Sequence, residues 1–375
     1  MSSLDHLIHP FVPQYHKWAR FVNPRTGFFS NDIPRVNFGT GFLVSNQFDI
    51  MEYPHLHEAT CEFFVFTGAE LDRIFDAEFQ VDFFLGDSAN SMELYHITKP
   101  TVVCVPPSVW HCPIFYKKVV RGINTMILFT GANWGKVLSR LDENGNEELY
   151  YEAGMEKHCE KDPTKKCTYC GECISESYDG EAVMNKYLEK FYQNAAPRSG
   201  NYDKYIYELR KDEHKLGDAV MNPRAVFKGI DDVDIAEHQF SFNIVTKPVK
   251  LGDDEPVSNG QQAEYLWFSG TDVTCEFECF DAEIEVEVGE DPEHMQKLII
   301  DKPAVITIPP GYWRGAVTVK RVGKPLCFIP WYQHTEKRYK ITQKLVDGGR
   351  LLVYNDEDTI ANPTPGDELF LQIKR

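Results

Sequence analysis

Two short segments carry the strongest indication of what this chain is: H-L-H-E-A-T-C-E from His55 to Glu62, and P-P-S-V-W-H ending at His111. Three imidazoles and one carboxylate can fill part of the coordination shell of a divalent metal and leave positions open, which distinguishes a catalytic site from a structural one. His55 and His57 are two positions apart, so both side chains point to one face of a β-strand. We therefore predict one metal centre with His55, His57, Glu62 and His111 as ligands.

These segments resemble the motifs of the cupin family. The first family motif is H-x-H, three or four residues, Glu and a later Gly, and here His55, His57 and Glu62 are followed by Gly68. The second, P-x-G-x-x-H, is similar to residues 106–111. The framing residues depart from the family pattern at three positions, which hold Asp49, Ser108 and Phe115. Because all four ligand positions match, the resemblance implies a jelly-roll barrel that holds a metal.

An internal repeat indicates a second copy of the same unit. Residues 92–119 contain K-P, P-P, W and K-K-V, and residues 295–322 contain K-P, P-P, W and K-R-V at a constant offset of 203. Two copies of one β-rich unit in a chain resemble a two-domain cupin, or bicupin.

The second copy lacks the imidazoles of the first. Aligned on Gly270, it keeps Glu264 at the place of Glu62, but the histidine positions hold Val257, Asn259 and Arg314. A guanidinium group carries only hydrogen-bond donors and cannot replace a ligand. We predict that the second copy is free of metal and that Arg314 pairs with Glu264, because a buried charge must be satisfied. Binding of an anion in a vestigial pocket is the alternative.

The predicted fold is mainly all-β, with two jelly-roll cupin barrels, an N-terminal extension and a partly helical, Cys-rich linker. We place the extension and the metal-binding barrel at 1–135, the linker at 136–200 and the second barrel at 201–375. Short β-branched and aromatic runs punctuated by turn residues predict many strands. These runs are 61–66, 78–85, 94–97, 101–105 and 121–129, then 264–268, 274–280, 284–288, 298–300 and 304–308. Helical spacing predicts a helix over 182–194.

The linker contains four cysteines spaced C-x7-C-x2-C-x2-C: Cys159, Cys167, Cys170 and Cys173. This spacing is compatible with a zinc site, with an iron–sulfur cluster similar to the first part of a ferredoxin motif, or with free thiols. The remaining cysteines fall mostly in apolar runs, which predicts buried thiols rather than disulfides.

Composition limits the partners. The net charge of −18 disfavours nucleic acid and anionic membrane surfaces. The sequence shows no basic start followed by an apolar run and no apolar stretch of about 18 residues, which predicts cytoplasmic localisation without a membrane span. We expect a small-molecule substrate, and the resemblance to bicupins is compatible with a homo-oligomer.

The resemblance implies a substrate with neighbouring or 1,3-related oxygens, bound at one Mn, Fe, Zn, Co or Ni ion. We predict non-oxidative hydrolase or lyase chemistry, because a cysteine-rich linker with cluster character would be damaged by iron and oxygen. The metal would stabilise an enolate or activate water. The candidate reaction is hydrolytic C–C cleavage that opens a cyclic 1,3-diketone, as in anaerobic polyphenol or phloroglucinol breakdown. Candidate acid/base residues are Glu58, Tyr53 and His96.

Two other classes remain open. One is an Fe- or Mn-dependent dioxygenase or an oxalate-decarboxylase-like enzyme, and oxygen consumption would identify the dioxygenase. The other is a non-catalytic cupin that binds a small molecule. The ligand set is complete in the first copy and lost in the second, and this contrast favours catalysis.

Overall fold

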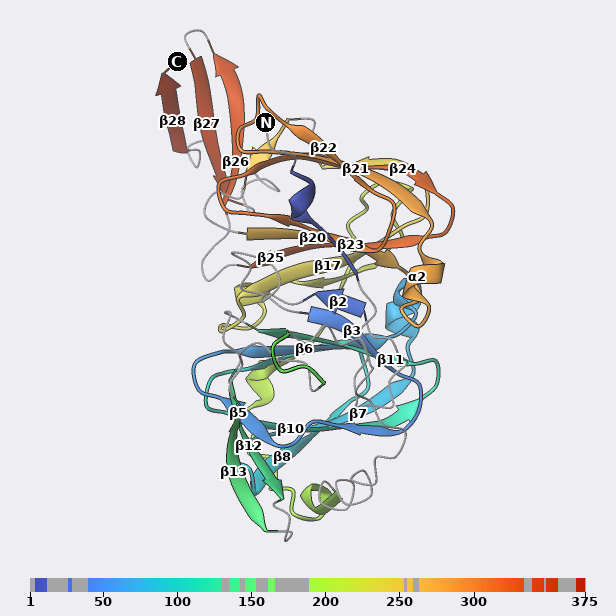
Figure 1. Ribbon diagram of the computed structural model, residues 1–375, viewed down its shortest axis with the longest axis vertical. Helices are drawn as coiled ribbons and strands as arrows, with labels where there is room; N and C mark the ends of the chain where they lie inside the picture. The colour runs from blue at the N-terminus through green and yellow to red at the C-terminus, as the bar shows by residue number, and fades with distance from the viewer. Residues whose placement is uncertain are drawn as a thin grey trace. The chain divides into compact units, whose positions relative to one another are not determined.

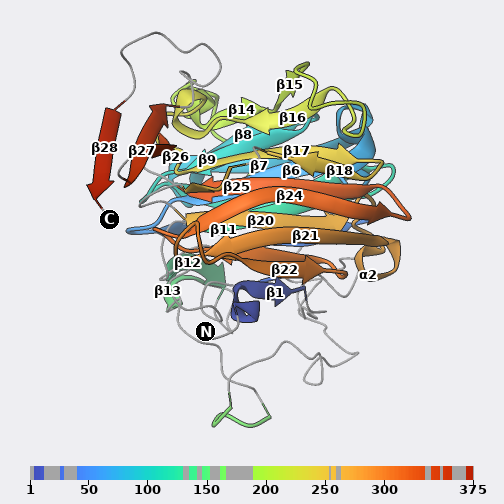
Figure 2. The ribbon, with the colours of Figure 1, turned by 90° about the horizontal axis from the view of Figure 1, so that it is seen from above.

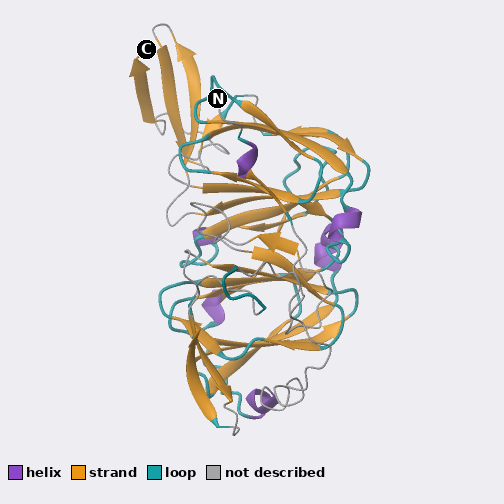
Figure 3. Ribbon diagram, viewed as in Figure 1, coloured by secondary structure: helices purple, strands orange, loops and turns teal. Residues whose placement is uncertain are grey.

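The computed structural model describes residues 4–11, 26–28, 40–129, 135–141, 146–152, 161–165, 189–252, 255–258, 263–333, 339–346, 349–356 and 369–374. Most of this part of the chain is strand, and the helices in it are short (Figure 3). The chain divides into two compact units, one formed by 12–209 with 272–274 and the other by 1–11, 210–271 and 275–375. Each unit contains one barrel. The predicted all-β class with two jelly-roll barrels is confirmed.

The first barrel consists of two antiparallel sheets (Figure 1). One sheet has the order β8 (Ser91–Ile97), β7 (Phe79–Ser88), β10 (Trp110–Val119), β5 (His55–His57), β12 (Lys136–Leu141) and β13 (Glu147–Glu152), and β4 (Asp49–Met51) also pairs with β10. The other has the order β14 (Ile206–Glu208), β9 (Thr101–Val105), β6 (Glu62–Gly68), β11 (Ile123–Phe129), β3 (Thr40–Ser45) and β2 (Thr26–Phe28). Short 3-10 helices lie at Leu71–Asp76 and Asp203–Tyr205.

The second barrel repeats this strand order. One sheet runs β22 (Gln296–Ile300), β21 (Ala282–Gly289), β24 (Trp313–Val322), β19 (Val257–Ser258), β26 (Tyr339–Val346), β27 (Gly349–Asp356) and β28 (Leu369–Lys374), and β18 (Val249–Leu251) also pairs with β24. The other runs β1 (Ile8–Pro10), β23 (Ala304–Ile308), β20 (Ala263–Gly270), β25 (Leu326–Gln333), β17 (His238–Val245), β16 (Arg224–Phe227) and β15 (Arg210–Asp212). Figure 2 shows β27 and β28 continuing from β26 at the edge of their sheet. Short 3-10 helices lie at Asp5–Leu7 and Gly229–Asp231.

Strand register confirms the repeat residue by residue. In the first barrel His111 of β10 lies opposite His55 of β5. In the second barrel Arg314 of β24 lies opposite Val257 of β19. The two pairs occupy the same position in the same strand order. The structure therefore places Arg314 and Val257 at the positions of His111 and His55, as the sequence alignment predicted.

Each barrel has its own apolar core between its two sheets. Inward-facing aromatic and β-branched side chains alternate with outward-facing ones along the strands, as a pleated sheet requires. Burial of one such side chain contributes about 1.5–3 kcal/mol. The first core includes Phe64, Phe66, Phe83, Val103 and Ile114, and the second includes Leu266, Phe268, Ile284, Ile306 and Val317. These rigid cores fix the strands that carry the candidate site.

The start of the chain differs from the predicted boundary. β1 pairs with β23, so residues 8–10 extend a sheet of the second barrel rather than the first. Pairing satisfies the backbone groups at the open edge of β23, which would otherwise be a free sheet edge.

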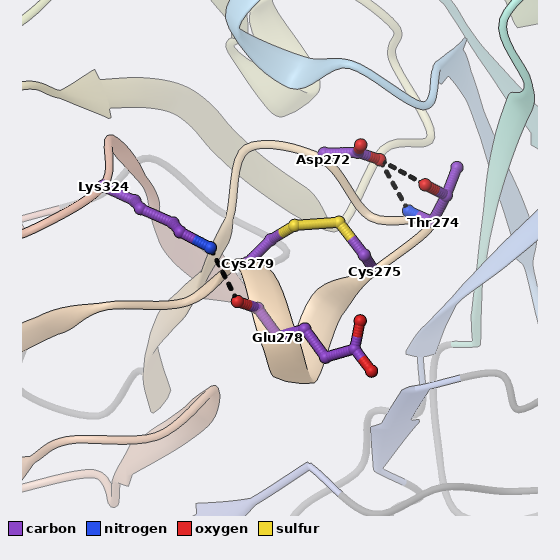
Figure 4. The surroundings of a disulfide bond; sticks show 6 residues. All are labelled: Asp272, Thr274, Cys275, Glu278, Cys279 and Lys324. Carbon is purple, nitrogen blue, oxygen red and sulfur yellow. Dashed lines mark hydrogen bonds between the residues drawn. A yellow bond between two sulfur atoms is a disulfide. The ribbon is translucent and has the colours of Figure 1, made fainter.

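The predicted strand at 274–280 is wrong. These residues include a short helix, α2 (Glu276–Cys279), and Cys275 forms a disulfide with Cys279 (Figure 4). Lys324 Nζ donates a 2.9 Å hydrogen bond to the carbonyl of Glu278 in the same helix. The prediction of buried thiols is therefore wrong for Cys275 and Cys279, whereas Cys104, Cys112 and Cys327 are buried free thiols. Here the two cysteines meet across the single turn of α2, and the Thr and Phe residues of this stretch favoured a strand in the sequence.

Removing this disulfide should have a modest effect. The bond closes a loop with a sequence separation of only 4 residues, and in the chain-entropy account the stabilisation grows with loop length. We expect Cys275→Ser with Cys279→Ser to lower the free energy of unfolding by no more than about 2 kcal/mol. Urea unfolding of the double variant and of the parent checks this, and a loss twice as large would show that α2 depends on the disulfide for its fold.

Two smaller expectations concern helices. Residues 189–193 are helical, in agreement with the C-terminal part of the helix predicted over 182–194, whose other residues lie mostly outside the described ranges. Among the described residues, the helices are all too short or too polar to cross a membrane.

Candidate metal centre

The pleat of strand β5 places two histidines on the inner face of the first barrel. His55 and His57 are both buried, and Leu56 between them packs on the outer face against a cluster that includes Phe84 and Phe115. An apolar side chain between two polar ones therefore fixes which face the imidazoles occupy. The predicted orientation of the two histidines is confirmed.

Three imidazoles converge on one carboxylate oxygen. The Nε2 atoms of His55, His57 and His111 lie 3.4, 3.0 and 2.6 Å from Oε2 of Glu62. Each residue offers a ligand atom, and these atoms all lie within 4.8 Å of one another. All four residues are at most 3% exposed. The structure thus brings together the complete His/Glu set that the sequence predicted from β5, β6 and β10.

A backbone carbonyl holds the outer nitrogen of each imidazole. Nδ1 of His55 lies 2.8 Å from the Tyr53 carbonyl, Nδ1 of His57 lies 3.1 Å from the Gly135 carbonyl, and Nδ1 of His111 lies 3.0 Å from the Val109 carbonyl. A carbonyl only accepts, so each Nδ1 carries the proton and donates it. Each neutral ring then directs the lone pair of Nε2 inward. This arrangement is typical of metal-ligating histidines, whose second nitrogen is oriented by such a partner.

The donor set fits a divalent cation. Four acceptors are directed at one point: three nitrogen lone pairs and an ionised carboxylate. None of them can donate a hydrogen bond to another, and burial of polar atoms without complementary partners costs free energy. A cation at that point would satisfy all four groups together. Imidazole and carboxylate ligands suit Mn, Fe, Co, Ni or Zn, and four ligands leave positions of an octahedron for a substrate.

The electrostatics keep the ligands in their binding forms. Burial, together with His111 and Lys136, lowers the pKa of His55 from 6.5 to about 3, so this imidazole is neutral. The thiol of Cys112 stays protonated, because burial and the neighbouring Glu62 raise its pKa.

The low pKa of His55 predicts a pH-dependent stability of the metal-free protein. Below pH 6.5 the unfolded chain binds a proton at this residue, whereas the native state stays neutral until about pH 3. The unfolded state then holds more protons, so stability is lost as the pH falls through this window. The slope for this group is at most about 1.4 kcal/mol per pH unit. Urea unfolding of the metal-free protein at several pH values should show a shallower slope in His55→Gln, and equal slopes would contradict the assignment.

Two of the three predicted acid/base residues have side chains that lie apart from this cluster. The backbone carbonyl of Tyr53 orients His55, but its side chain packs on the outer face with Ile50 and its neighbours. His96 is exposed on β8, and its Nδ1 lies 2.6 Å from Asp82. Glu58 follows β5 and is exposed. The structure therefore does not bring the side chain of Tyr53 or of His96 to the metal ligands. The role of Glu58 stays a prediction.

The second predicted metal site concerns the linker. Its four cysteines, Cys159, Cys167, Cys170 and Cys173, lie outside the described residues. A zinc site or an iron–sulfur cluster there stays a prediction.

Several residues surround the centre, and two of them, Phe129 and Lys136, were missed by the sequence reasoning. Phe129 contacts His57 with ring centroids 5.4 Å apart, and Phe64 contacts His111 at 5.8 Å. Lys136 forms a 2.8 Å ion pair with Glu52, and the Lys136 side chain is only 11% exposed. Lys136 lies opposite His57 in the pairing of β12 with β5. No spacing in the sequence connects these positions, since the barrel alone brings them together.

Comparisons with known proteins bear on the fold. No family model matches the chain, and no curated protein matches it. Among solved structures, a mutant of oxalate decarboxylase from Bacillus subtilis is similar, with 9% identity, a TM-score of 0.50, and coverage of 88% of this chain and 77% of that one.

Two further solved structures are similar at lower scores. One is a Bacillus subtilis oxalate decarboxylase studied for its Mn(II) centres, with 10% identity, a TM-score of 0.49, and coverage of 97% and 87% of the two chains. The other is the formate complex of Lactobacillus farciminis oxalate decarboxylase, with 10% identity, a TM-score of 0.48, and coverage of 88% and 86%. The strand order, its repeat and the first of these likenesses agree: this chain has the bicupin fold, with a His/Glu metal-ligand set in its N-terminal cupin barrel.

Proposed function

We propose that this chain is a metal-dependent enzyme that acts without oxidation on a small substrate bearing carbonyl or carboxylate oxygens. The observation that carries the proposal is the convergence of three oriented Nε2 atoms on buried Glu62. Four ligands from three strands leave coordination positions open, which a structural site would close.

The protein's own residues set the conditions for this chemistry. When bound, a divalent cation supplies Lewis acidity that stabilises an enolate or activates water. Glu62 contributes negative charge, so the three neutral imidazoles leave a net positive centre that attracts an anionic or enolic oxygen. Phe64 packs against the ring of His111 and Phe129 against the ring of His57, so the ligand rings have apolar neighbours. The backbone carbonyls hold the rings in one orientation before a substrate binds.

Two reactions fit this site. Hydrolytic opening of a cyclic 1,3-diketone uses the chelating geometry of its enolate oxygens. Decarboxylation of a small dicarboxylate is the second, and the likeness in fold to oxalate decarboxylase favours it. Both need the same Lewis acid and neither consumes oxygen overall, so one enzyme preparation can be tested for both.

The experiment compares wild type with His111→Ala after loading each with Mn(II), Fe(II), Co(II), Ni(II) or Zn(II) under anaerobic conditions. Oxalate would yield formate and carbon dioxide, and cyclohexane-1,3-dione would take up water to yield 5-oxohexanoate. Turnover of either by wild type alone supports the proposal. Activity equal in both proteins would contradict the site. Consumption of oxygen during turnover, measured in a parallel assay in air, would move the protein to the dioxygenases, and binding without turnover would make it a binding protein.

A further inference from the structure

The second barrel contains a cavity of about 150 Å³ next to the position that corresponds to one metal ligand of the first barrel. Tyr332 lies opposite Glu264 in the pairing of β25 with β20, as Phe129 lies opposite Glu62 in the pairing of β11 with β6. Arg314, at the place of His111, lines this cavity with Tyr332. The loss of the histidines has therefore left a lined pocket.

Two arginines line the pocket, and each is held by a carboxylate that lies outside the pocket lining. Nε of Arg314 lies 2.8 Å from both oxygens of Glu264, whose side chain is 1% exposed. Arg224 pairs with Asp212 and donates a 3.1 Å hydrogen bond to Oδ1 of Asn243. These partners fix the two guanidinium groups in place, so their orientation does not depend on a ligand.

The pocket offers donors without matching acceptors. Nε of Arg224 is buried and has no hydrogen-bond partner in the described part of the chain. A guanidinium carries five N–H donors. In Arg314, Nε contacts Glu264, Nη1 donates a 3.3 Å bond to the Gly315 carbonyl, and Tyr332 is a further side-chain partner. Ser241 accepts a bond from Asn243 and keeps its own proton to donate. Among the described residues, no Asp or Glu side chain lines this pocket. A ligand here must therefore supply acceptors.

The rest of the lining is apolar. It consists of Leu216, Leu251, Val317, Phe328 and Pro330, together with Gly252. A cavity of this volume, about 150 Å³, accommodates a molecule of roughly six non-hydrogen atoms, such as benzene. The lining is thus arranged for a molecule with an anionic end and an apolar remainder.

We propose that the second barrel binds a small organic carboxylate, with its carboxylate on Arg224 and Arg314 and its apolar part against Phe328 and its neighbours. The proposal is independent of turnover at the metal centre. It assigns to the metal-free barrel a binding role instead of a purely structural one. Both arginines stay paired to their carboxylates, and their remaining N–H groups hold the ligand in charge-assisted hydrogen bonds.

The test is isothermal titration of the full chain with butyrate, with neutral butyramide as the matched probe and inorganic phosphate as a second anion. Titrations are repeated in His111→Ala, because a metal centre also binds carboxylates, and in Arg224→Lys, which keeps the charge but removes the Nε donor. Arg210→Lys is the matched control, since Arg210 pairs with Asp232 and does not line the cavity. Leu216→Trp adds bulk at the exposed edge of the pocket without changing charge.

We expect butyrate to bind wild type and His111→Ala equally and to bind Arg224→Lys at least about tenfold more weakly. Leu216→Trp should also weaken binding, and Arg210→Lys should not. The proposal is overturned if butyrate does not bind wild type, if butyramide binds as tightly, or if phosphate binds more tightly. It is also overturned if binding disappears in His111→Ala and survives in Arg224→Lys, because the ligand would then occupy the first barrel.

Discussion

His111→Ala will lose the metal of the first barrel and all activity that depends on it, while keeping its fold. His111 contributes the Nε2 closest to Glu62, at 2.6 Å, and its ring is oriented by the Val109 carbonyl. Loss of a residue that merely orients a ligand costs about 10–100-fold in metal affinity, so loss of the ligand itself should cost more than about 100-fold. Metal analysis of the purified variant, with circular dichroism as the check on fold, measures this.

The control for this variant is His96→Ala. His96 is also a histidine on a strand of the first barrel, but its side chain is 59% exposed and contacts Asp82 instead of the metal ligands. It should retain metal and activity close to wild type. Equal metal loss in the two variants, or full metal retention in His111→Ala, would show that the ligand set is misassigned.

Arg314→Met will destabilise the protein by about 3–5 kcal/mol, because it leaves a buried carboxylate without its partner. The side chain of Glu264 is 1% exposed and that of Arg314 is 13% exposed. Adding Glu264→Gln in the same chain removes the uncompensated charge and should recover most of the loss. Urea unfolding of the single and double variants measures the effect, and metal content should be unchanged in both.

The comparison for this effect is an exposed pair in the same barrel. Arg321 pairs with Asp281, and the two side chains are 54% and 47% exposed. Exposed pairs contribute little, so Arg321→Met should cost less than about 1 kcal/mol. If Arg314→Met lowered the free energy of unfolding no more than Arg321→Met, the buried pair would not contribute to the stability of the fold. If Arg314→Met lost metal, the assignment of a metal-free second barrel would be wrong.

The metal ligands could be predicted from the sequence because their information is local. His55 and His57 alternate with a single apolar residue, and a period of two fixes their common face. His111 and its frame recur in the second copy as residues around Arg314, so the repeat also located the lost ligands and the ion pair with Glu264. These inferences depended only on residue types and spacings.

Other features could not be predicted because they depend on backbone positions or on strand pairing. The carbonyls of Tyr53, Val109 and Gly135 orient the imidazoles, and a carbonyl has no signature in the sequence. The side chains of Tyr53 and His96 lie away from the metal ligands, because closeness in sequence does not decide where a side chain points. The disulfide of Cys275 depends on a single helical turn within an otherwise strand-like stretch.

We infer that one metal ion is held by three imidazoles and a carboxylate in the first barrel. X-ray absorption at the manganese edge of Mn(II)-loaded protein tests it most directly, because the signal comes only from the bound ion and its neighbours. The structure predicts a shell of nitrogen and oxygen atoms with the multiple scattering of three imidazoles, lost in His111→Ala. A shell containing sulfur, or one without imidazole scattering, would contradict the claim.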